Sequence, residues 1–321
     1  MELRHLRYFI AVIEEQSFTK AAEKLCMAQP PLSKQIKNLE ESLGVELIDR
    51  SSRPLKPTKS GEIFYANALI ILNKVTETKA LTQNLQNSED TIKIGFVVSL
   101  LYGLLPKIIY SYRMLHPNTK IELIEIGTVK QIDALKRGEI DIGFGRIRTS
   151  DPEIHRSLLR EEPLSVVVSN QHPFINHPHK ITLAEIASEN VLLYPNHSFP
   201  NLSTQISNIF TNHGLQLDRS ELVRDIQLAL GLVAANEGIC IVPASAAKVS
   251  VDNVSYLPIA DHFATSPIIS SIRETENREK VLDLFSSIKH VYNSEGMLSD
   301  EKTIDNILKE FKINHKKIKS Q

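Results

Sequence analysis

Residues 17–48 constrain the fold more than any other part of this 321-residue chain, because they read as two short helices joined by a tight turn. In the second helix, apolar residues at spacings of four, three and four share one face; these are Leu32, Ile36, Leu39 and Leu43. Ser33, Lys34 and Lys37 project from another face, in the first half of that helix. A helix with cations near its start and acids at its far end suits insertion into the major groove of DNA.

The residues around this segment complete a small helical domain. A first helix runs from about Leu3 to Glu15, with its apolar residues on one face; these are Leu6, Phe9, Ile10 and Ile13. Ser17 is a residue type that commonly caps a helix start. Pro30 and Pro31 can open a helix but cannot continue one, so they mark the start of the helix that carries the cations.

A basic loop follows the helices. Its sequence, RSSRPLKPTK, contains two prolines and four cations, which are Arg50, Arg53, Lys56 and Lys59. A stiff basic loop of this kind resembles a wing that lies along a phosphate backbone. The alternative is a small helical core with a solvated loop, but the loop and the charge distribution of the helix together favour DNA binding.

The overall charge looks unsuitable for binding DNA, because 37 Lys and Arg against 38 Asp and Glu give a formal net charge of −1. The positive excess is local. Residues 1–60 contain ten Lys and Arg and eight Asp and Glu, so this segment has a charge of +2 and the remainder −3. The field that DNA would experience therefore comes from the helix and loop, and it is modest.

The N-terminus and the cysteines favour a cytoplasmic protein. Met1 is followed by charged residues rather than by the apolar core of a signal peptide. No apolar run approaches the roughly 18 residues of a membrane helix, so no membrane contact is expected. Cys26 and Cys240 fall in different predicted domains and are expected to be reduced thiols.

Residues 58–86 read as one long helix without proline, which would extend roughly 40 Å at 1.5 Å per residue. Apolar and small residues recur at spacings of three and four; these are Phe64, Ala68, Ile71, Val75, Thr78, Thr82 and Leu85. A small domain cannot cover a helix of this length, so the seam is predicted to contact a second copy of the chain. The alternative is a helix buried within one large domain.

From Thr91 onward, strand-like and helix-like segments alternate, which implies a parallel sheet with helices on its faces. The first block contains the strands TIKIGFV, IELIEIG and IDIGFG and the helices LLYGLLPKIIYSYRMLH and VKQIDALKRGEI. The second block contains LSVVVSN, NVLLYP, a helix at residues 203–213 and GICIVPAS. Residues 267–272 and the helix EKVLDLFSSIKHVYN return to the first block, which predicts two α/β subdomains with a cleft between them.

Polar residues occur in this second region where strands end and helices begin, the position at which α/β proteins bind ligands. The residues at three such junctions are Ser99, Thr128 and the segment 200–203, which includes Ser203. Arg146 follows a strand at the same end of the sheet. Helix N-termini and an arginine suit a small carboxylate. The alternative is that the hydroxyls are helix caps and Arg146 is a surface ion pair.

The N-terminal sequence MELRHLRYFIAVIEEQSFTKAAEKLCMAQPPLSKQIKNLEESLGVELIDR resembles that of LysR-type transcriptional regulators, in particular those that control aromatic-compound catabolism in response to muconate or benzoate. The resemblance extends to about Glu295. It implies an all-α winged helix-turn-helix, a long linker helix and a C-terminal α/β effector domain built like a periplasmic binding protein. The implied divisions are 1–58 for DNA binding, 59–88 for the linker helix, 89–295 for effector binding and 296–321 for a tail, with effector subdomain I at about 89–161 and 267–295 and subdomain II at about 162–266.

The resemblance also implies which residues face double-stranded promoter DNA. They are Gln29, Pro30, Ser33, Lys34 and Gln35 on the third helix and Arg53 in the wing. The charge pattern adds Lys37 and Arg50. Many relatives have arginine in place of Lys34, and lysine lacks the fork that binds guanine at two points. We therefore expect Lys34 to contact phosphate.

The effector pocket implied by the resemblance coincides with the predicted cleft. It is lined by Ser99, Leu100, Thr128, Pro200, Asn201 and Leu202, with Arg146 nearby. Relatives often have phenylalanine in place of Leu202, and the smaller leucine would enlarge the pocket or loosen its fit. One relative has a second, apolar pocket for an aromatic acid, of which Arg160 and Tyr292 match two polar positions.

The implied mechanism is that of a homotetrameric activator, a dimer of dimers. Our hypothesis is that a carboxylate effector moves one subdomain against the other, DNA bending changes, and RNA polymerase is recruited; the coupling required is about 1–3 kcal/mol. A LysR-type regulator of another pathway with a different effector is the alternative.

Other functional classes find little support. The chain lacks the Gly-x-Ser-x-Gly, Gly-x-Gly-x-x-Gly and Walker A sequences, so an enzyme is not expected. A transport-type solute receptor would resemble the second region alone, without the basic N-terminal module. His172, His177 and His179 lie close together, but no acidic residue lies between them, so neither a metal nor another cofactor is expected.

The lysine-rich tail is expected to be solvated or loosely docked, with non-specific help in DNA binding as the alternative.

Overall fold

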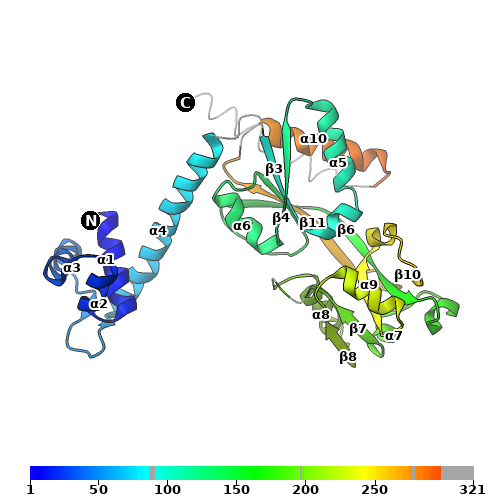
Figure 1. The fold of residues 1–321 in the computed structure, drawn as a ribbon, viewed down its shortest axis with the longest axis horizontal. Coiled ribbons are helices and arrows are strands. Elements are labelled where there is room, and N and C mark those ends of the chain that lie inside the picture. The colour runs from blue at the N-terminus through cyan, green and yellow to red at the C-terminus, as the bar shows by residue number, and fades with distance from the viewer. Residues whose placement is uncertain (87–90, 196, 198, 277–278, 298–321) are drawn as a thin grey trace. The chain divides into compact units, whose positions relative to one another are not determined.

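The structure, a computed structural model, describes residues 1–86, 91–195, 197, 199–276 and 279–297 (Figure 1). The chain forms two compact units, Met1–Gln83 and Asn84–Gln321. Most of the predicted tail, residues 298–321, lies outside the described residues. Among the described residues, no helix combines the length and the apolar character that crossing a lipid bilayer requires.

The first unit contains three short helices, a small hairpin and most of a long helix. Their bounds are α1 Leu3–Glu15, α2 Phe18–Lys24, α3 Gln29–Leu43, β1 Ile48–Asp49, β2 Lys56–Pro57 and α4 Lys59–Gln86. Ser17 caps α2 as predicted, since its Oγ accepts a hydrogen bond from the backbone N of Lys20 at 3.4 Å. Gly44 ends α3 in the left-handed region, with φ of 71°. The helices of the predicted helix-turn-helix are therefore confirmed.

The core of this unit follows the predicted apolar face of α3 with one exception. Leu32, Ile36 and Leu39 are fully buried against side chains of α1, α2 and the hairpin. Leu43 was predicted to share this face but is 39% exposed. It is the last residue of α3, where the left-handed conformation of Gly44 turns the chain away from the helix.

The long helix α4 has the predicted length, but its apolar seam divides into two parts. Ala68 is buried and, together with Phe64, packs against Leu6 and Ile10 of α1. These first two seam positions therefore belong to the core of the unit rather than to a dimer contact. Ile71 remains 39% exposed. The side chain of Leu85, the last seam position, lies outside the described part of the chain.

The second unit combines a mixed sheet with helices on its faces. Its first strands and helices are β3 Thr91–Phe96, η1 Val98–Tyr102, α5 Leu105–Leu115, β4 Lys120–Glu125, α6 Thr128–Lys136, β5 Ile142–Gly145 and β6 Ile154–Ser169. The middle elements are η2 Pro173–Asn176, α7 Leu183–Ala187, β7 Asn190–Leu193, α8 Leu202–Asn212, β8 Arg219–Leu222, α9 Ile226–Ala234 and β9 Ile239–Pro243. The last are η3 Ala244–Lys248, β10 Val254–Pro258, β11 Thr265–Arg273 and α10 Glu279–Ser294.

Two strands, β6 and β11, run between the two halves of this unit (Figure 1). Within the described residues the strand order is β4-β3-β5-β11-β6-β9-β7-β8, and β10 also pairs with β6. The 16-residue strand β6 pairs with β11 along its first part and with β9 and β10 along its second. All of these pairings are antiparallel, whereas β3 pairs with β4 and β5, and β7 with β8 and β9, in the predicted parallel direction. The sheet is therefore mixed rather than parallel throughout. The chain must return between subdomains, and the returning strands run against their neighbours.

One predicted helix is broken. The segment LLYGLLPKIIYSYRMLH was predicted to be continuous, but its start belongs to the 3-10 helix η1 and the rest forms α5. Gly103 separates them with φ of −92° and ψ of −135°, which is not a helical conformation. The break matters for the site described below, because it leaves Ser99 on a short turn at the end of β3.

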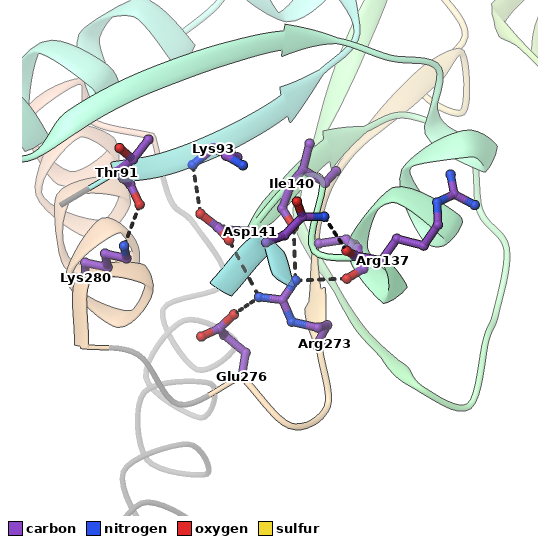
Figure 2. A network of polar contacts seen from close by, with 10 residues as sticks. Thr91, Lys93, Arg137, Ile140, Asp141, Arg273, Glu276 and Lys280 are labelled. Carbon is purple, nitrogen blue, oxygen red and sulfur yellow. Dashed lines mark hydrogen bonds and ion pairs between the residues drawn. The ribbon is translucent and has the colours of Figure 1, made fainter. Parts of the chain in front are cut away.

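A buried polar network anchors the end of β11 (Figure 2). Arg273 donates through Nη1 to the backbone oxygens of Leu135 and Ile140, at 2.9 and 3.0 Å. Its Nη2 contacts the carboxylate of Glu276 and lies 3.7 Å from Asp141 Oδ1. All three charged side chains are buried. Arg273 therefore holds the turn between α6 and β5 against the last strand.

We predict that Arg273→Ala destabilises the effector unit by about 3–5 kcal/mol, because it leaves two buried carboxylates without their arginine partner. Chemical unfolding of the full chain, followed through the transition of this unit, measures the effect. Arg148→Ala is the matched control. Arg148 pairs with Glu161 but is 62% exposed, so its loss should cost less than about 1 kcal/mol. Equal losses in both variants would contradict the prediction.

Candidate functional site

The first candidate surface is the start of α3. Gln29, Pro30, Lys34 and Lys37 are exposed, and Ser33 and Gln35 are partly exposed. The apolar residues of α3 face the core, so the predicted DNA-contacting residues share the outward side of the helix. This arrangement leaves a polar ridge with a free helix start, as a recognition helix requires.

The side chains on this ridge differ in how firmly they are held. Gln35 Oε1 lies 2.8 Å from His5 Nε2 of α1, so its amide is oriented by the neighbouring helix. Lys37 lies 3.7 Å from Glu41, one turn further along α3. In the part of the chain that the structure describes, Lys34 has no ion-pair partner. It is thus the cation on α3 whose charge is least compensated.

The predicted wing forms the loop between β1 and β2, which are paired at Ile48–Pro57 and Asp49–Lys56. Arg53 donates through Nη1 to the backbone oxygens of Arg50 and Ser52, at 3.0 and 2.8 Å. These bonds hold one side of its guanidinium against the loop, and the residue remains exposed.

Arg50 is partly neutralised within the unit. Its Nη2 donates to Glu40 Oε2 at 2.7 Å, and its guanidinium carbon lies 5.6 Å from the ring centre of Phe18. Glu40 lies with Glu41 in the far half of α3, away from the cations at its start. Its side chain is buried, and its Oε1 accepts hydrogen bonds from the backbone N of Leu47 and Ile48, at 2.9 and 3.2 Å. Glu40 therefore ties α3 to the wing, a role that spacing alone did not reveal.

The second candidate site centres on Arg146, which follows β5. Its guanidinium is almost fully buried, and its Nη2 donates to Glu162 Oε2 of β6 at 2.5 Å. Its Nε donates to Ser99 Oγ at 2.8 Å, and its backbone N donates to Thr128 Oγ1 at 3.1 Å. The remaining guanidinium nitrogen, Nη1, is buried and has no hydrogen-bond partner among the described residues. Arg146 is therefore not a surface pair, and it brings Ser99 and Thr128 together as the sequence predicted.

The hydroxyls in this site are not helix caps. Gly127, rather than Thr128, caps α6, and Asn201 caps α8 through Oδ1, which accepts from the backbone N of Thr204 at 3.2 Å. Ser203 donates to the same Oδ1 at 2.7 Å. The capping interpretation of the three hydroxyls was thus wrong, and their bonds serve to position other polar groups.

The start of α8 offers backbone rather than side-chain groups. The side-chain nitrogen Nδ2 of Asn201 donates to the backbone oxygens of Pro195 and His197, at 2.9 and 2.7 Å. Both hydrogens of this side-chain amide are therefore used within the protein. The backbone N–H groups of Leu202 and Ser203 have no acceptor within the helix, as in the first turn of any α-helix. Pro200 is exposed beside them.

Two predicted pocket residues contribute mainly to the core. The side chains of Leu100 and Leu202 are buried in the hydrophobic clusters of subdomains I and II, respectively. Leu100 also donates its backbone N–H to Val97 at 3.0 Å. These two residues can shape a pocket wall, but they leave few polar groups free.

Glu162 joins the two subdomains chemically and was not predicted from the sequence. Its Oε1 accepts from the backbone N of Ser245 at 3.0 Å and lies 3.7 Å from Arg160 Nη2. Burial alone would raise the pKa of the Glu162 carboxyl. Arg146, Ser245 and Arg160 outweigh burial and hold this pKa below its ordinary value. Glu162 therefore stays ionised and fixes Arg146 in place.

Arg160 and Tyr292 lie together, as the predicted second pocket requires. Tyr292 is buried in α10; burial raises the pKa of its phenol, while the adjacent Arg160 acts to lower it. Arg160 Nε is buried without a hydrogen-bond partner among the described residues. The hydroxyls of Tyr194 and Ser245 are also buried without a hydrogen-bond partner among the described residues. Neither was predicted, because isolated Tyr and Ser residues carry no signal in sequence.

Comparison with known families accounts for both halves of the chain. Residues 3–62 match the bacterial regulatory helix-turn-helix proteins of the lysR family. Residues 86–291 match the LysR substrate binding domain. The chain belongs to the LysR family of transcriptional regulators. The predicted family and fold class are thereby confirmed.

Individual LysR-type relatives are similar over nearly the whole chain. The chain is 52% identical over 297 residues to the HTH-type transcriptional regulator BenM of Acinetobacter baylyi, covering 92% of this chain and 98% of BenM. It is 39% identical over 293 residues to a probable cat1 operon transcriptional activator of Acinetobacter lwoffii, covering 91% and 96% of the two chains.

Solved structures agree with this assignment. Full-length BenM superposes with a TM-score of 0.64 at 50% identity, covering 93% of this chain and 99% of BenM. The BenM effector binding domain with its effector benzoate gives a TM-score of 0.64 at 47% identity, covering 66% of this chain and 96% of that one.

For this LysR-type regulator, we predict that Glu40→Ala destabilises the DNA-binding unit by about 2–4 kcal/mol. The change leaves the backbone N–H groups of Leu47 and Ile48 unpaired beneath the wing. Glu41→Ala, at the next position on the exposed face, is the control and should cost less than about 1 kcal/mol. Unfolding of the DNA-binding unit measures both, and a neutral Glu40→Ala would contradict this role.

Proposed function

We propose that this LysR-type regulator activates genes for aromatic-compound degradation, such as those for catechol or benzoate, in response to a small carboxylate. Benzoate and cis,cis-muconate are the candidate effectors. The observation that carries the proposal is the buried Nη1 of Arg146, a positive donor without a partner among the described residues. A buried charged donor is costly unless an acceptor reaches it, and a carboxylate is a fitting acceptor. The names of the relatives, a cat1 operon activator and a benzoate-binding BenM domain, support the same effector class.

In the proposed complex, the carboxylate lies between Arg146 and the start of α8. Ser99 and Thr128 hold Arg146 and remain close enough to take part, and the first N–H groups of α8 favour negative charge. Since the side chain of Asn201 is occupied, Asn201 and Leu202 would act through the backbone and Pro200 through its shape. The buried leucine side chains would set pocket volume.

We also propose a second carboxylate site at Arg160 and Tyr292, supported by the buried Nε of Arg160, which has no hydrogen-bond partner among the described residues. Glu162 is shared, because its two oxygens face Arg146 and Arg160. An anion bound to Arg160 would weaken the attraction between Arg160 and Glu162. The attraction between Glu162 and Arg146 would then become stronger. Coupling of this kind is expected to be worth about 1–3 kcal/mol.

Self-association is proposed from two exposed apolar surfaces. One lies on α4 and includes Ile63, Ile70 and Ile71; the other lies on α5 and includes Tyr110 and Met114. Two independent surfaces are what a dimer of dimers needs, since each copy must bind two partners. In this assembly, paired α3 helices would contact promoter DNA in the cytoplasm, and effector binding would alter DNA bending and recruit RNA polymerase.

The effector proposal predicts that one of these acids raises the thermal midpoint of the full-length protein, because a ligand that binds only the native state stabilises it. Benzoate, cis,cis-muconate and non-aromatic dicarboxylates are compared at matched ionic strength. Ser99→Ala should weaken binding of the active acid about tenfold, the value of a hydrogen bond to a charged group. Ser255→Ala, which alters a serine bonded to Asn170, should leave binding unchanged.

The outcomes separate the candidate effectors. A shift with benzoate or cis,cis-muconate that Ser99→Ala weakens supports the proposal and identifies the acid. A shift by a non-aromatic acid alone favours a LysR-type regulator of another pathway. No shift with any acid contradicts a carboxylate effector and leaves the family assignment intact.

The DNA proposal predicts that Lys34→Ala weakens promoter binding at every sequence tested. It should also reduce the magnitude of the slope of log K against log salt by about 1 per bound subunit, as loss of a phosphate contact does. Lys24→Ala is the control, because Lys24 is already paired with Glu14 and Glu15 and should change affinity less than about twofold. Loss of binding at one sequence only would instead indicate a base contact by Lys34.

A further inference from the structure

Two histidines and a glutamate form a compact cluster that shares no residue with the effector cleft. His177 and His179 lie in the loop after η2, and Glu185 lies in the first turn of α7. The Nε2 atoms of His177 and His179 are 3.1 and 3.8 Å from the same oxygen, Glu185 Oε1. One ligand atom from each of the three residues lies within 4.8 Å of the others.

The ring of His177 is oriented as in a metal ligand. Its Nδ1 lies 3.3 Å from the backbone oxygen of His179. Because a carbonyl oxygen only accepts, Nδ1 must donate, so Nε2 is the nitrogen that faces Glu185 and would give up its proton on binding a metal. Histidines that bind metals usually donate their other ring N–H to a carbonyl or carboxylate in this way.

The carboxylate of Glu185 is also held in place. Its Oε2 accepts from the backbone N and the Oγ1 of Thr182, at 2.8 and 2.7 Å, in a capping box. Its other oxygen, Oε1, faces the two histidines.

The distances from the two histidine nitrogens to the Glu185 oxygen suit one small metal ion. Bonds of about 2.0–2.1 Å in a tetrahedral site place ligand atoms roughly 3.3 Å apart. The two observed nitrogen-to-oxygen separations, 3.1 and 3.8 Å, lie on either side of this value. Two imidazoles and one carboxylate are a ligand set that zinc, nickel and copper accept. His179 is exposed, which leaves room for water at a fourth position.

We propose that His177, His179 and Glu185 bind one divalent transition-metal ion of the zinc class per chain. The ion joins the loop after η2 to the start of α7. The sequence alone did not predict a metal site here, because no acidic residue lies between the histidines along the chain. Glu185 follows His179 by six residues, and the chain folds it back onto them.

The test uses full-length protein without an affinity tag, freed of metal by a chelator and then titrated with zinc in equilibrium dialysis. We expect one zinc ion to bind tightly to each chain. Zinc should also raise the midpoint of thermal unfolding, since the ion binds the native state. Glu185→Gln should weaken this binding at least about tenfold while keeping the cap, because glutamine also serves at that capping-box position. The double variant His177→Gln/His179→Gln should abolish it.

The matched control is His155→Gln. His155 lies 3.6 Å from Glu274 in the same unit, and within the described residues it belongs to no cluster of metal-binding groups, so its replacement should leave the tightly bound ion in place. If wild type binds no zinc ion tightly, or if both site variants bind zinc as wild type does, the cluster is an ion pair only and the proposal is overturned.

Discussion

The ion pair between Arg146 and Glu162 is the contact on which the effector unit depends. Both side chains are almost fully buried, one at the end of β5 and the other on the crossing strand β6. A buried pair gains little net stability, because desolvation offsets the attraction, but removing one partner is costly. Its value here is geometric. Glu162 is also fixed by the backbone of Ser245, so a guanidinium from one subdomain is oriented by groups from the other.

In the proposed function, this arrangement would let the site around Arg146 respond to a small anion. Arg146 uses Nε, Nη2 and its backbone N within the protein and keeps Nη1 for another acceptor. An effector carboxylate would compete with Glu162 for the same charge. The position of Glu162 relative to Ser245 and Arg160 would then shift, which is a differential contact between two states, as any population shift requires.

The sequence predicted elements with strong local signals and missed those set by tertiary context. The helices of the DNA-binding unit were predictable from the spacing of Leu32, Ile36 and Leu39 and from Ser17 as a cap. The helix α9, IQLALGLVA, was missed because it is apolar on nearly every side and lacks a 3.6-residue period. The first part of β6, rich in charged residues, was missed because its strand conformation depends on pairing with β11.

The candidate site was predictable to a similar degree. Ser99, Thr128 and Arg146 could be placed together because strand ends meet at one edge of a sheet. Glu162 could not, since its partners come from segments more than 80 residues later and 16 residues earlier in the chain. The burial of Glu40 beneath the wing was equally hidden, because a glutamate on a helix normally faces solvent.

The path from the cleft to the linker helix is short. Asn84, near the end of α4, donates to the backbone oxygen of Arg137 at 2.8 Å. The turn that follows is anchored by Arg273 and ends at Asp141, whose carboxylate accepts from the backbone N of Lys93 at 2.8 Å (Figure 2). Between Asp141 and Arg146 lies only the four-residue strand β5. A strand hydrogen-bonded on both sides moves as a unit, so in the proposed mechanism a displacement of Arg146 by an effector reaches the end of α4 without a longer route.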